Sequence, residues 1–256
     1  MRTPRSYQTQ AIVIRQIKLG EVDKILTIYT PDFGKLKAVA KGACRPRSKL
    51  GGNVEPLTHS LMMLARGRNL DIITQSQTID GFLALKSDLW RMACGFYLLE
   101  LVDSFTVENN ENPPLFALLL DTLRRLCQAD NSEIVLRYFE LHFLHYLGYR
   151  PQLHHCVICN SPLRPVVNFF SFSQGGILCP HCGEKEPESR PLSVDALKIL
   201  RLWQNCDYAT AKRVKMKSKL SSQLKRVVQG YIKYLLQREV KSIAWLEELR
   251  GVDKSL

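Results

Sequence analysis

AIVIRQIKLGEVDKILTIYTPDFGKLKAVA, residues 11–40, is the stretch that decides the fold of the first part of the chain. It contains three short runs rich in β-branched and apolar residues, Ala11–Ile17, Ile25–Thr30 and Leu36–Ala40. Runs of this length and composition are typical of strands. Turn-forming sequences, Leu19-Gly20-Glu21 and Pro31-Asp32-Phe33-Gly34, separate them. The stretch therefore predicts three consecutive antiparallel strands.

Two further runs, Pro56–Ala65 and Leu70–Thr78, continue the pattern on either side of the turn Arg66-Gly67-Arg68-Asn69. One long connection, Gly42–Glu55, separates them from the first three runs. Five antiparallel strands with one long connection predict an OB-type barrel over residues 1–80, a fold whose second and third strands and loops usually bind nucleic acid. An SH3-like barrel would give a similar pattern.

From residue 81 onward, the spacing of the apolar residues becomes helical. Pro113 and Pro114 are placed to open one helix, Ser132 to cap the next and Gly148 to end it. Another helix is expected from Ser193, and a last long one over residues 220–235. The predicted fold class is α+β multidomain: a five-stranded OB-type barrel at residues 1–80, then a helical domain at residues 81–256 with a zinc-ribbon insert at about residues 151–190.

The insert contains two C-x2-C pairs, Cys156-Val157-Ile158-Cys159 and Cys179-Pro180-His181-Cys182. At this spacing, two tight turns each offer two thiolates to one tetrahedral ion. Four thiolates favour zinc, and a site filled by four protein ligands leaves no position for water or substrate. We therefore expect one structural Zn²⁺ held by Cys156, Cys159, Cys179 and Cys182.

Two disulfides and an iron–sulfur cluster are the alternatives for these four cysteines. Disulfides need an oxidising compartment, whereas the start of the chain has no apolar run that would direct secretion. An iron–sulfur cluster would give visible absorbance. The other four cysteines are scattered singly, and no nucleophile is implied by their surroundings.

Basic residues in the predicted barrel gather in one strand, the connection after it and one turn. Because side chains alternate along a strand, Lys35, Lys37 and Lys41 are expected on one face and the apolar residues between them on the core face. The connection and the turn can reach a phosphate backbone. The predicted DNA-binding residues are Lys35, Lys37, Lys41, Arg45, Arg47, Lys49, Arg66 and Arg68.

The net charge of +12 is uneven along the chain. Residues 1–80 contain 13 basic and 6 acidic residues, and residues 191–256 contain 14 and 6. Such local excess indicates a polyanionic partner, either nucleic acid or an anionic membrane surface. A second run, residues 212–226, has seven cations and no acid. It is a solvated face, a second polyanion contact or a site for an acidic peptide.

The order of these parts resembles the RecO family of bacterial recombination-mediator proteins, and the resemblance covers nearly the whole chain. Matching motifs in the first part include Gly20-Glu21-Val22-Asp23-Lys24-Ile25 and Lys41-Gly42-Ala43 running into Arg45-Pro46-Arg47-Ser48-Lys49-Leu50. Further on, Leu147-Gly148-Tyr149-Arg150-Pro151 leads into the first cysteine pair and Gly175-Gly176-Ile177-Leu178 into the second. Each motif alone is weak, but together they are specific.

The resemblance implies binding of single- and double-stranded DNA and annealing of complementary strands. It also implies work with RecR to load RecA onto DNA coated by single-strand-binding protein. Two positions depart from the family pattern: Cys44 replaces a basic residue, and Asn160 stands where glycine is common after the first cysteine pair. Asparagine tolerates the left-handed backbone expected there. The residues that bind the tail of single-strand-binding protein cannot be matched by position.

We expect no enzymatic activity, because the chain has no G-x-x-x-x-G-K-[ST] loop for a triphosphate. A zinc-containing glycosylase or nuclease is the enzyme alternative, but Arg2 occupies the position of the glycosylase's N-terminal proline nucleophile. An RNA-binding module is the third class. No run approaches the roughly 18 apolar residues of a membrane span. We therefore expect a cytoplasmic, nucleoid-associated protein without a membrane partner.

Overall fold

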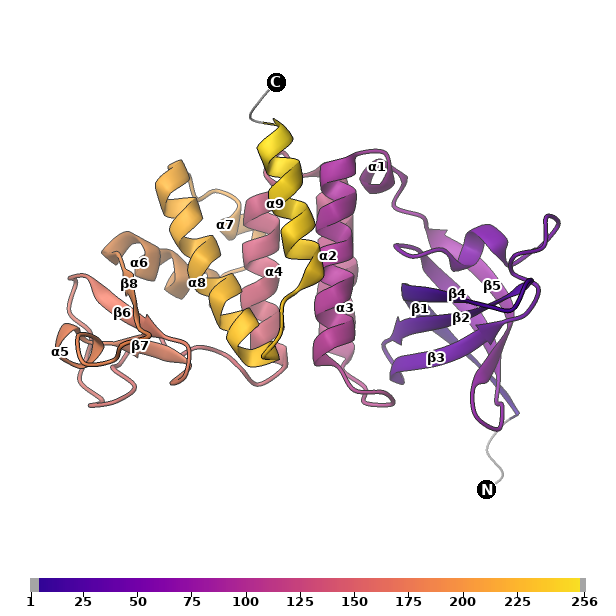
Figure 1. Ribbon diagram of the computed structural model, residues 1–256, viewed down its shortest axis with the longest axis horizontal. Coiled ribbons are helices and arrows are strands. Elements are labelled where there is room, and N and C mark those ends of the chain that lie inside the picture. The colour runs from indigo at the N-terminus through magenta and orange to yellow at the C-terminus, as the bar shows by residue number, and fades with distance from the viewer. Residues whose placement is uncertain (1–4, 254–256) are drawn as a thin grey trace. The chain divides into compact units, whose positions relative to one another are not determined.

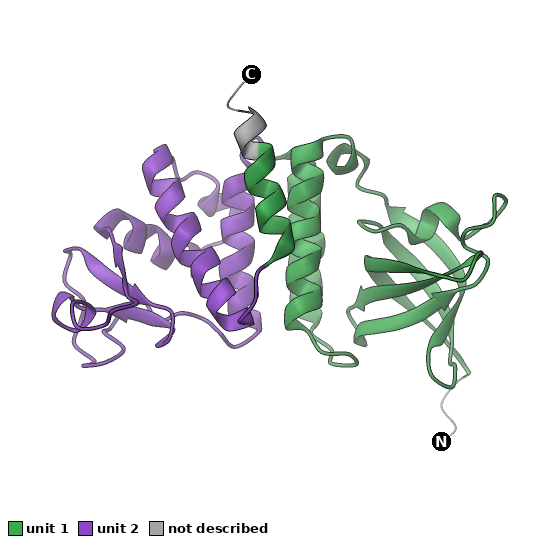
Figure 2. Cartoon of the chain, viewed as in Figure 1, with its two compact units in different colours: residues 1–129, 240–256 green, residues 130–239 purple. Residues whose placement is uncertain are grey.

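The computed structural model describes residues 5–253, with side chains as far as residue 249 (Figure 1). The chain forms two compact units, residues 1–129 with 240–256 and residues 130–239 (Figure 2). Among the described helices, none has both the length and the apolar character needed to span a membrane.

The first unit begins with a closed barrel of five strands in the order β1-β2-β3-β5-β4. The strands are β1 (Ser6–Leu19), β2 (Asp23–Thr30), β3 (Gly34–Ala40), β4 (His59–Ala65) and β5 (Asp71–Asp80). β1 pairs antiparallel with both β2 and β4, and β3 runs parallel to β5. This arrangement confirms the predicted OB-type barrel but corrects the expectation that all five strands are antiparallel. Because β4 is antiparallel to both β1 and β5, β5 runs in the same direction as β3 where the barrel closes. A short 3₁₀ turn, η1 (Gly51–Val54), lies in the long connection.

The barrel core follows from alternation along the strands. Leu26 and Ile28 of β2 and Leu36 and Ala38 of β3 point inward and are buried. Tyr29 is also fully buried, so it cannot stack on a base. Burial of these side chains removes their apolar surface from water and holds the sheet closed.

Four helices complete the first unit: α1 (Leu83–Lys86), α2 (Leu89–Phe105), α3 (Pro113–Gln128) and α9 (Lys241–Asp253). Pro113 and Pro114 open α3 as predicted, and the Asn112 side chain caps it. The sequence did not predict α9. Its first backbone N–H groups, at Lys241 and Ser242, donate to the Glu100 carboxylate of α2, at 2.9 and 2.8 Å. Because the residue that caps α9 is so distant in the chain, the sequence around residue 241 contains no sign that a helix begins there.

The two compact units do not coincide with the ranges 1–80 and 81–256, because the helices after the barrel pack against it. The backbone N–H of Asn109 donates to the carbonyl of Lys35 at 2.9 Å, on an edge of β3. At Gly34 (φ +64°), an added Cβ would lie 1.9 Å from the Asn110 carbonyl oxygen, so only glycine fits there. The segment 106–112 therefore packs closely against the barrel.

The second unit combines helices with a three-stranded sheet, β7-β6-β8. Its elements are α4 (Ser132–Tyr146), β6 (Asn168–Ser171), β7 (Gly176–Leu178), α5 (Pro180–Gly183), β8 (Arg190–Leu192), α6 (Val194–Trp203), α7 (Tyr208–Ala211) and α8 (Ser218–Leu236). The N-cap of α4 is Asn131 and not Ser132, since the Asn131 side chain accepts from the N–H of Glu133. Gly148 ends this helix as expected, with φ +83°.

Candidate metal centre and cationic surfaces

The first cysteine pair lies on a tight turn before β6. The N–H of Asn160 donates to the carbonyl of Cys156 at 2.9 Å, and the N–H of Cys156 donates to the carbonyl of Ser161 at 2.9 Å. Asn160 has φ +56°, the left-handed conformation expected for this departure from glycine. These backbone bonds turn the Cys156 and Cys159 side chains to the same side.

The second pair joins β7 to the short helix α5. Cys179 is the N-cap of α5 and Cys182 lies inside it, and the N–H of Gly183 donates to the carbonyl of Cys179 at 2.8 Å. A Cβ at Gly183 would lie 2.3 Å from the Phe169 ring, so this turn packs closely against β6. The sheet thus holds the second turn opposite the first.

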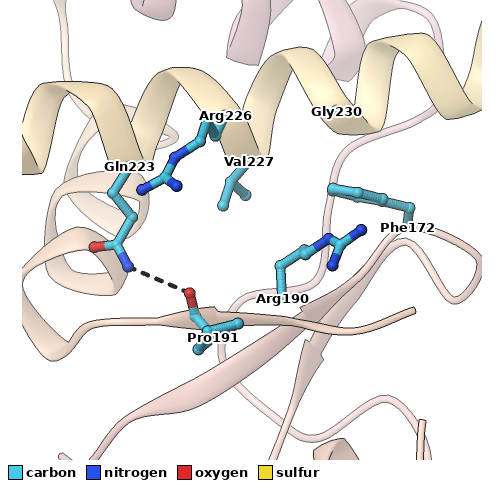
Figure 3. Close-up of a pocket in the computed structure, with 7 residues that line it drawn as sticks. All are labelled: Phe172, Arg190, Pro191, Gln223, Arg226, Val227 and Gly230. Atoms are coloured by element: carbon cyan, nitrogen blue, oxygen red, sulfur yellow. Dashed lines mark hydrogen bonds between the residues drawn. The ribbon is translucent and has the colours of Figure 1, made fainter. Parts of the chain in front are cut away.

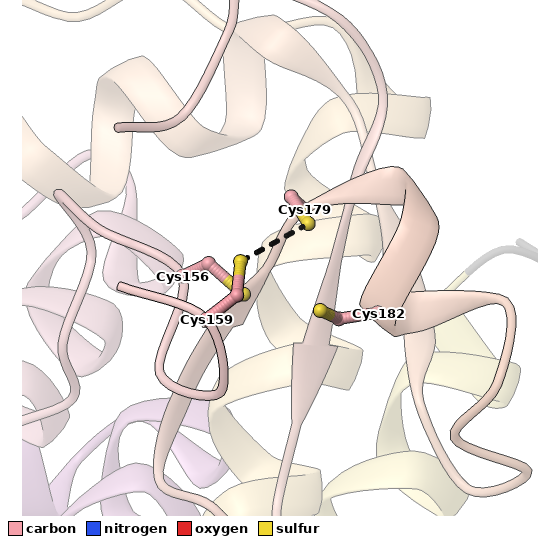
Figure 4. Close-up of side chains that lie close together, drawn as sticks. All are labelled: Cys156, Cys159, Cys179 and Cys182. Atoms are coloured by element: carbon pink, nitrogen blue, oxygen red, sulfur yellow. Dashed lines mark hydrogen bonds between the residues drawn. The ribbon is translucent and has the colours of Figure 1, made fainter. Parts of the chain in front are cut away.

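The four sulfur atoms of Cys156, Cys159, Cys179 and Cys182 all lie within 4.8 Å of one another (Figure 4). The Sγ atoms of Cys159 and Cys179 are 3.8 Å apart. Four thiolates bound to Zn²⁺ at about 2.3 Å would have sulfur–sulfur distances of about 3.8 Å. All four are free thiols without a disulfide. The donor set and its dimensions therefore fit a tetrahedral metal ion.

Local hydrogen bonds favour the thiolate form at two of the four cysteines, whereas burial, followed by hydrogen bonds with the neighbouring cysteines, raises the pKa of Cys182. The hydroxyl and N–H of Ser161 lower the pKa of Cys159 to about 6. Burial opposes the thiolate at Cys156, but backbone N–H groups, that of Cys159 first, outweigh it and lower the pKa of this thiol. His181 is engaged elsewhere, with its Nε2 atom 3.0 Å from the Lys185 Nζ atom. The cluster consists of cysteines alone, as the spacing predicted.

The connection after β3 presents cations on a well-anchored loop. Ala43 is buried in the barrel core, and Leu50 packs against it. The N–H of Gly42 donates to the Asp23 carboxylate at 2.7 Å. The cationic side chains of this loop are exposed, and they form no ion pair with any described residue. They are Lys41, Arg45, Arg47 and Lys49. We call these four residues the barrel loop cations.

Lys35 and Lys37 lie on the face opposite the core, as their parity predicted, but this is not a free cationic face. Lys35 is buried, and its Nζ atom donates to the backbone oxygen of Asp103 at 2.6 Å and to its carboxylate at 3.2 Å. The Lys37 Nζ atom lies 2.6 Å from the Glu108 carboxylate. The acidic residues that follow the barrel thus neutralise both lysines.

The two arginines of the turn between β4 and β5, Arg66 and Arg68, have different surroundings. The Arg66 guanidinium lies 4.9 Å from the centre of the Tyr7 ring, whose hydroxyl donates to the Asp71 carboxylate at 2.5 Å. Burial and this hydrogen bond raise the pKa of Tyr7. Arg68 is exposed and forms no ion pair within the described chain. β5 begins beside Ala38 of β3, and because these two strands run parallel, this turn precedes the paired segment whereas the barrel loop follows it.

Replacing Lys35 with alanine should lower the free energy of unfolding of the first unit by about 1.5–3 kcal/mol, since it leaves the Asp103 carboxylate without its main partner. The salt dependence of DNA binding should not change. Urea unfolding and binding isotherms at several salt concentrations measure both effects. Lys37→Ala is the control, because its half-exposed ion pair should contribute less than about 1 kcal/mol. Normal stability with a weaker salt dependence would show instead that Lys35 contacts DNA.

Further candidate binding residues lie in the second unit, along α8. Phe172 and Arg190 approach Gln223 and Arg226 of this helix and enclose a cavity (Figure 3). The sequence suggested a role only for the cations of residues 212–226, because the other side chains come from separate elements. No spacing rule connects residues that only the tertiary fold brings together.

An OB-type barrel with exposed cations, followed in one chain by helices and a four-cysteine cluster, belongs to the class of multidomain DNA-binding proteins. The family comparison is more specific. The chain belongs to the RecO family: the family model described as Recombination protein O N terminal matches residues 1–82, and Recombination protein O C terminal matches residues 86–244. The resemblance inferred from the sequence is thereby confirmed.

Relatives named DNA repair protein RecO match over nearly their full length. One from Dehalococcoides mccartyi is 39% identical over 249 residues, covering 97% of this chain and 98% of the relative. One from Roseiflexus sp. is 39% identical over 246 residues, covering 96% of this chain and 87% of the relative. One from Halalkalibacterium halodurans is 30% identical over 246 residues, covering 96% of each.

Proposed function

We propose that this chain is a non-enzymatic recombination mediator of DNA repair that binds single- and double-stranded DNA through its barrel and anneals complementary strands. With RecR, it helps to load RecA onto DNA coated by single-strand-binding protein. The observation that carries this proposal is the family match, which extends over both parts of the chain. The protein acts in the cytoplasm, at the nucleoid, because its DNA partner is there.

The barrel loop cations, Lys41, Arg45, Arg47 and Lys49, are the main DNA contact in this proposal, and Arg68, on the turn between β4 and β5, is a separate candidate contact. Part of the β3 outer face is occupied by the end of α2 and by Glu108, which leaves the loop as the accessible cationic element. Tyr7 and Phe33 pack against each other, with ring centres 4.7 Å apart, and are only partly exposed. Phosphate contacts therefore provide most of the affinity, which is weakly sequence-specific and falls steeply with salt.

The four-cysteine cluster holds one structural Zn²⁺ in this proposal. Its fit rests on four converging thiols with the dimensions of a tetrahedral site. When bound, the ion cross-links the two cysteine turns and takes no part in a reaction. Leu178 and the partly buried Phe169 pack around the sulfurs, so the cluster is continuous with the core of the sheet.

The surroundings of the barrel carboxylates support a role without catalysis. Asp23 accepts from the Gly42 N–H, Asp32 from the Thr9 hydroxyl, and Asp71 from the Tyr7 hydroxyl. Within the described residues, the four cysteines are the one group of three or more side chains placed to share a metal. Arg2, which bears on the glycosylase alternative, lies outside the described residues.

Annealing of complementary strands that have been precoated with single-strand-binding protein tests the proposal. We expect the protein to accelerate duplex formation at least tenfold over the coated strands alone, without nucleotide, because a simple DNA binder does not displace the coat. Fluorescence quenching between end-labelled strands measures the rate. Duplex formation at the uncatalysed rate would contradict the mediator role.

Two further outcomes separate the alternative functions. Labelled DNA incubated with the protein and Mg²⁺ or Mn²⁺ should stay intact, and strand cleavage or base release would establish an enzyme. In competition, single-stranded DNA should displace RNA, and a clear preference for RNA would indicate an RNA-binding module. The partner site for single-strand-binding protein is expected in the helical part of the chain.

A further inference from the structure

Two adjoining cavities lie along α8 in the second unit, each with a volume of about 500 Å³. One is enclosed by α8, β8 and Phe172, the residue that follows β6 (Figure 3). The other lies between α8, the start of α6 and the segment before α8. Gln223 and Arg226 line both, so the cavities form one continuous groove, which we call the α8 groove.

One stripe of α8 forms the long wall of this groove. Lys219, Gln223, Arg226 and Gly230 are spaced by four, three and four residues, so they share a face of the helix. Gln223 ties this face to its surroundings: its Nε2 atom donates to the Pro191 carbonyl at 3.2 Å, and its Oε1 atom accepts from the Ser193 hydroxyl at 2.6 Å. The groove is therefore a built feature with a fixed wall.

The charge of the groove is strongly positive. Five of its lining residues are cations: Arg190, Lys215, Lys217, Lys219 and Arg226. Asp195 is the single acidic residue of the lining, and none of the five cations forms an ion pair with a described residue. By contrast, Lys233 on the same helix is paired with Glu239. Unpaired cations that converge on a cavity favour an anionic ligand.

An aromatic side chain faces the same space. Phe172 is half-buried, and its ring lies so close to α8 that a Cβ at Gly230 would be 2.6 Å from the ring. Its ring centre is 5.6 Å from that of Phe170, which supports it from the sheet. Arg190 projects into the cavity beside it (Figure 3). A fixed ring next to unpaired guanidinium groups is the combination that binds a base and its phosphates.

We propose that the α8 groove is a second binding site for single-stranded nucleic acid, in which a base stacks on Phe172 and phosphates contact Arg190, Arg226 and the lysines of residues 215–219. This inference rests on the proposed function and deepens it, because a protein that anneals strands benefits from holding two at once. A cavity volume of about 500 Å³ admits an unpaired base, whereas the bases of a duplex are already stacked in pairs and cannot stack on Phe172. The cations run the length of both cavities, as a regularly charged backbone requires, whereas a short acidic peptide needs only a local cluster.

Three matched triple variants of the full chain test this site. The groove triple is Lys215→Ala/Lys217→Ala/Lys219→Ala, and the loop triple is Arg45→Ala/Arg47→Ala/Lys49→Ala. The control triple, Arg164→Ala/Lys185→Ala/Lys198→Ala, removes the same charge from exposed positions of the second unit outside the groove. Each protein is bound to an immobilised oligothymidine, washed, and offered a labelled strand that is not complementary to the first.

We expect the groove triple to capture the second strand at least tenfold less well than the wild type, while its affinity for the first strand falls no more than about threefold. The control triple should behave as the wild type in both steps. If the groove triple captures the second strand normally, this inference is wrong but the proposed function stands. Two barrels, each holding one strand, would then explain the capture. No capture of any strand by the wild type would overturn the proposed function as well.

Photocrosslinking identifies the ring that contacts the base. A strand containing 5-iodouracil should form an adduct with Phe172, mapped by mass spectrometry, and Phe172→Leu should lose the adduct while keeping its metal content and folding. Adducts confined to the barrel would contradict the site. A synthetic peptide of acidic residues with an apolar end is the last probe. Suppose that this peptide binds the wild type but not the groove triple, and that the groove triple captures the second strand as well as the wild type does. The groove is then a peptide site and the inference is wrong.

Discussion

Serine in place of Cys156 and Cys179 should abolish metal binding and unfold the two cysteine turns and the sheet around them, about residues 151–192, while the barrel and the buried core of α4, α6 and α8 stay folded. Apparent binding free energies of structural Zn²⁺ are about 10–16 kcal/mol, comparable to the whole stability of a domain. Two turns and a short sheet otherwise have little core to hold them: the cluster's own packing is Leu178 with Phe169 and its neighbours. Elemental analysis measures the metal, and hydrogen exchange on the full chain locates the unfolded residues.

Cys206→Ser is the matched control, because this half-buried thiol lies in the same unit but outside the cluster. It should keep one zinc per chain and a normal exchange pattern. A chelator added to the wild type should reproduce the double variant. If the metal-free variant is soluble and fully protected from exchange, the metal is dispensable for folding. Visible absorbance of the purified protein would identify an iron–sulfur cluster in place of zinc.

The loop triple should bind single-stranded DNA about 100-fold more weakly than the wild type at 0.1 M salt. Each phosphate contact contributes about 0.7 to the slope of log affinity against log salt for single strands, so three lost contacts lower the slope by about 2. The difference should shrink as salt rises, because the released counterions carry most of the effect. Fluorescence anisotropy at roughly 0.05–0.5 M salt, a range over which the screening of charges changes strongly, measures both quantities.

The control triple keeps the total charge of the loop triple and should bind within about twofold of the wild type. This comparison separates local contacts from the general attraction of a chain with net charge +12. Equal weakening in both triples would mean that net charge, and not the barrel loop, decides the affinity. An unchanged salt slope in the loop triple would remove this loop from the DNA-binding surface.

Much of this fold could be predicted from local sequence patterns. The β-branched runs separated by turns predicted five strands because strand period and turn chemistry are properties of neighbouring residues. The C-x2-C pairs predicted the cluster for a similar reason: each pair is a local turn, and the shared metal chemistry joins them. Parity correctly placed Leu36 and Ala38 in the core and Lys35 and Lys37 on the opposite face.

Parity could not show what covers that face. Lys35 is buried against Asp103, 68 residues further along the chain, and Lys37 pairs with Glu108, so two residues predicted to contact DNA have acidic partners within the first unit. Likewise, α9 returns to α2 and is capped by Glu100, 141 residues before Lys241. The two compact units therefore divide the chain in a place that no composition change marks.

The sequence by itself determined the strands, the four-cysteine cluster, the family and the positions of the cationic runs, because each depends on residue type and short-range spacing. Only the tertiary structure decided which cations are free. It neutralised Lys35 and Lys37, left the barrel loop cations exposed, and brought Phe172 and Arg190 to Arg226 of α8. The physical reason is that charge pairing and cavities depend on distances between side chains from separate elements, and these distances exist only after the apolar faces have packed.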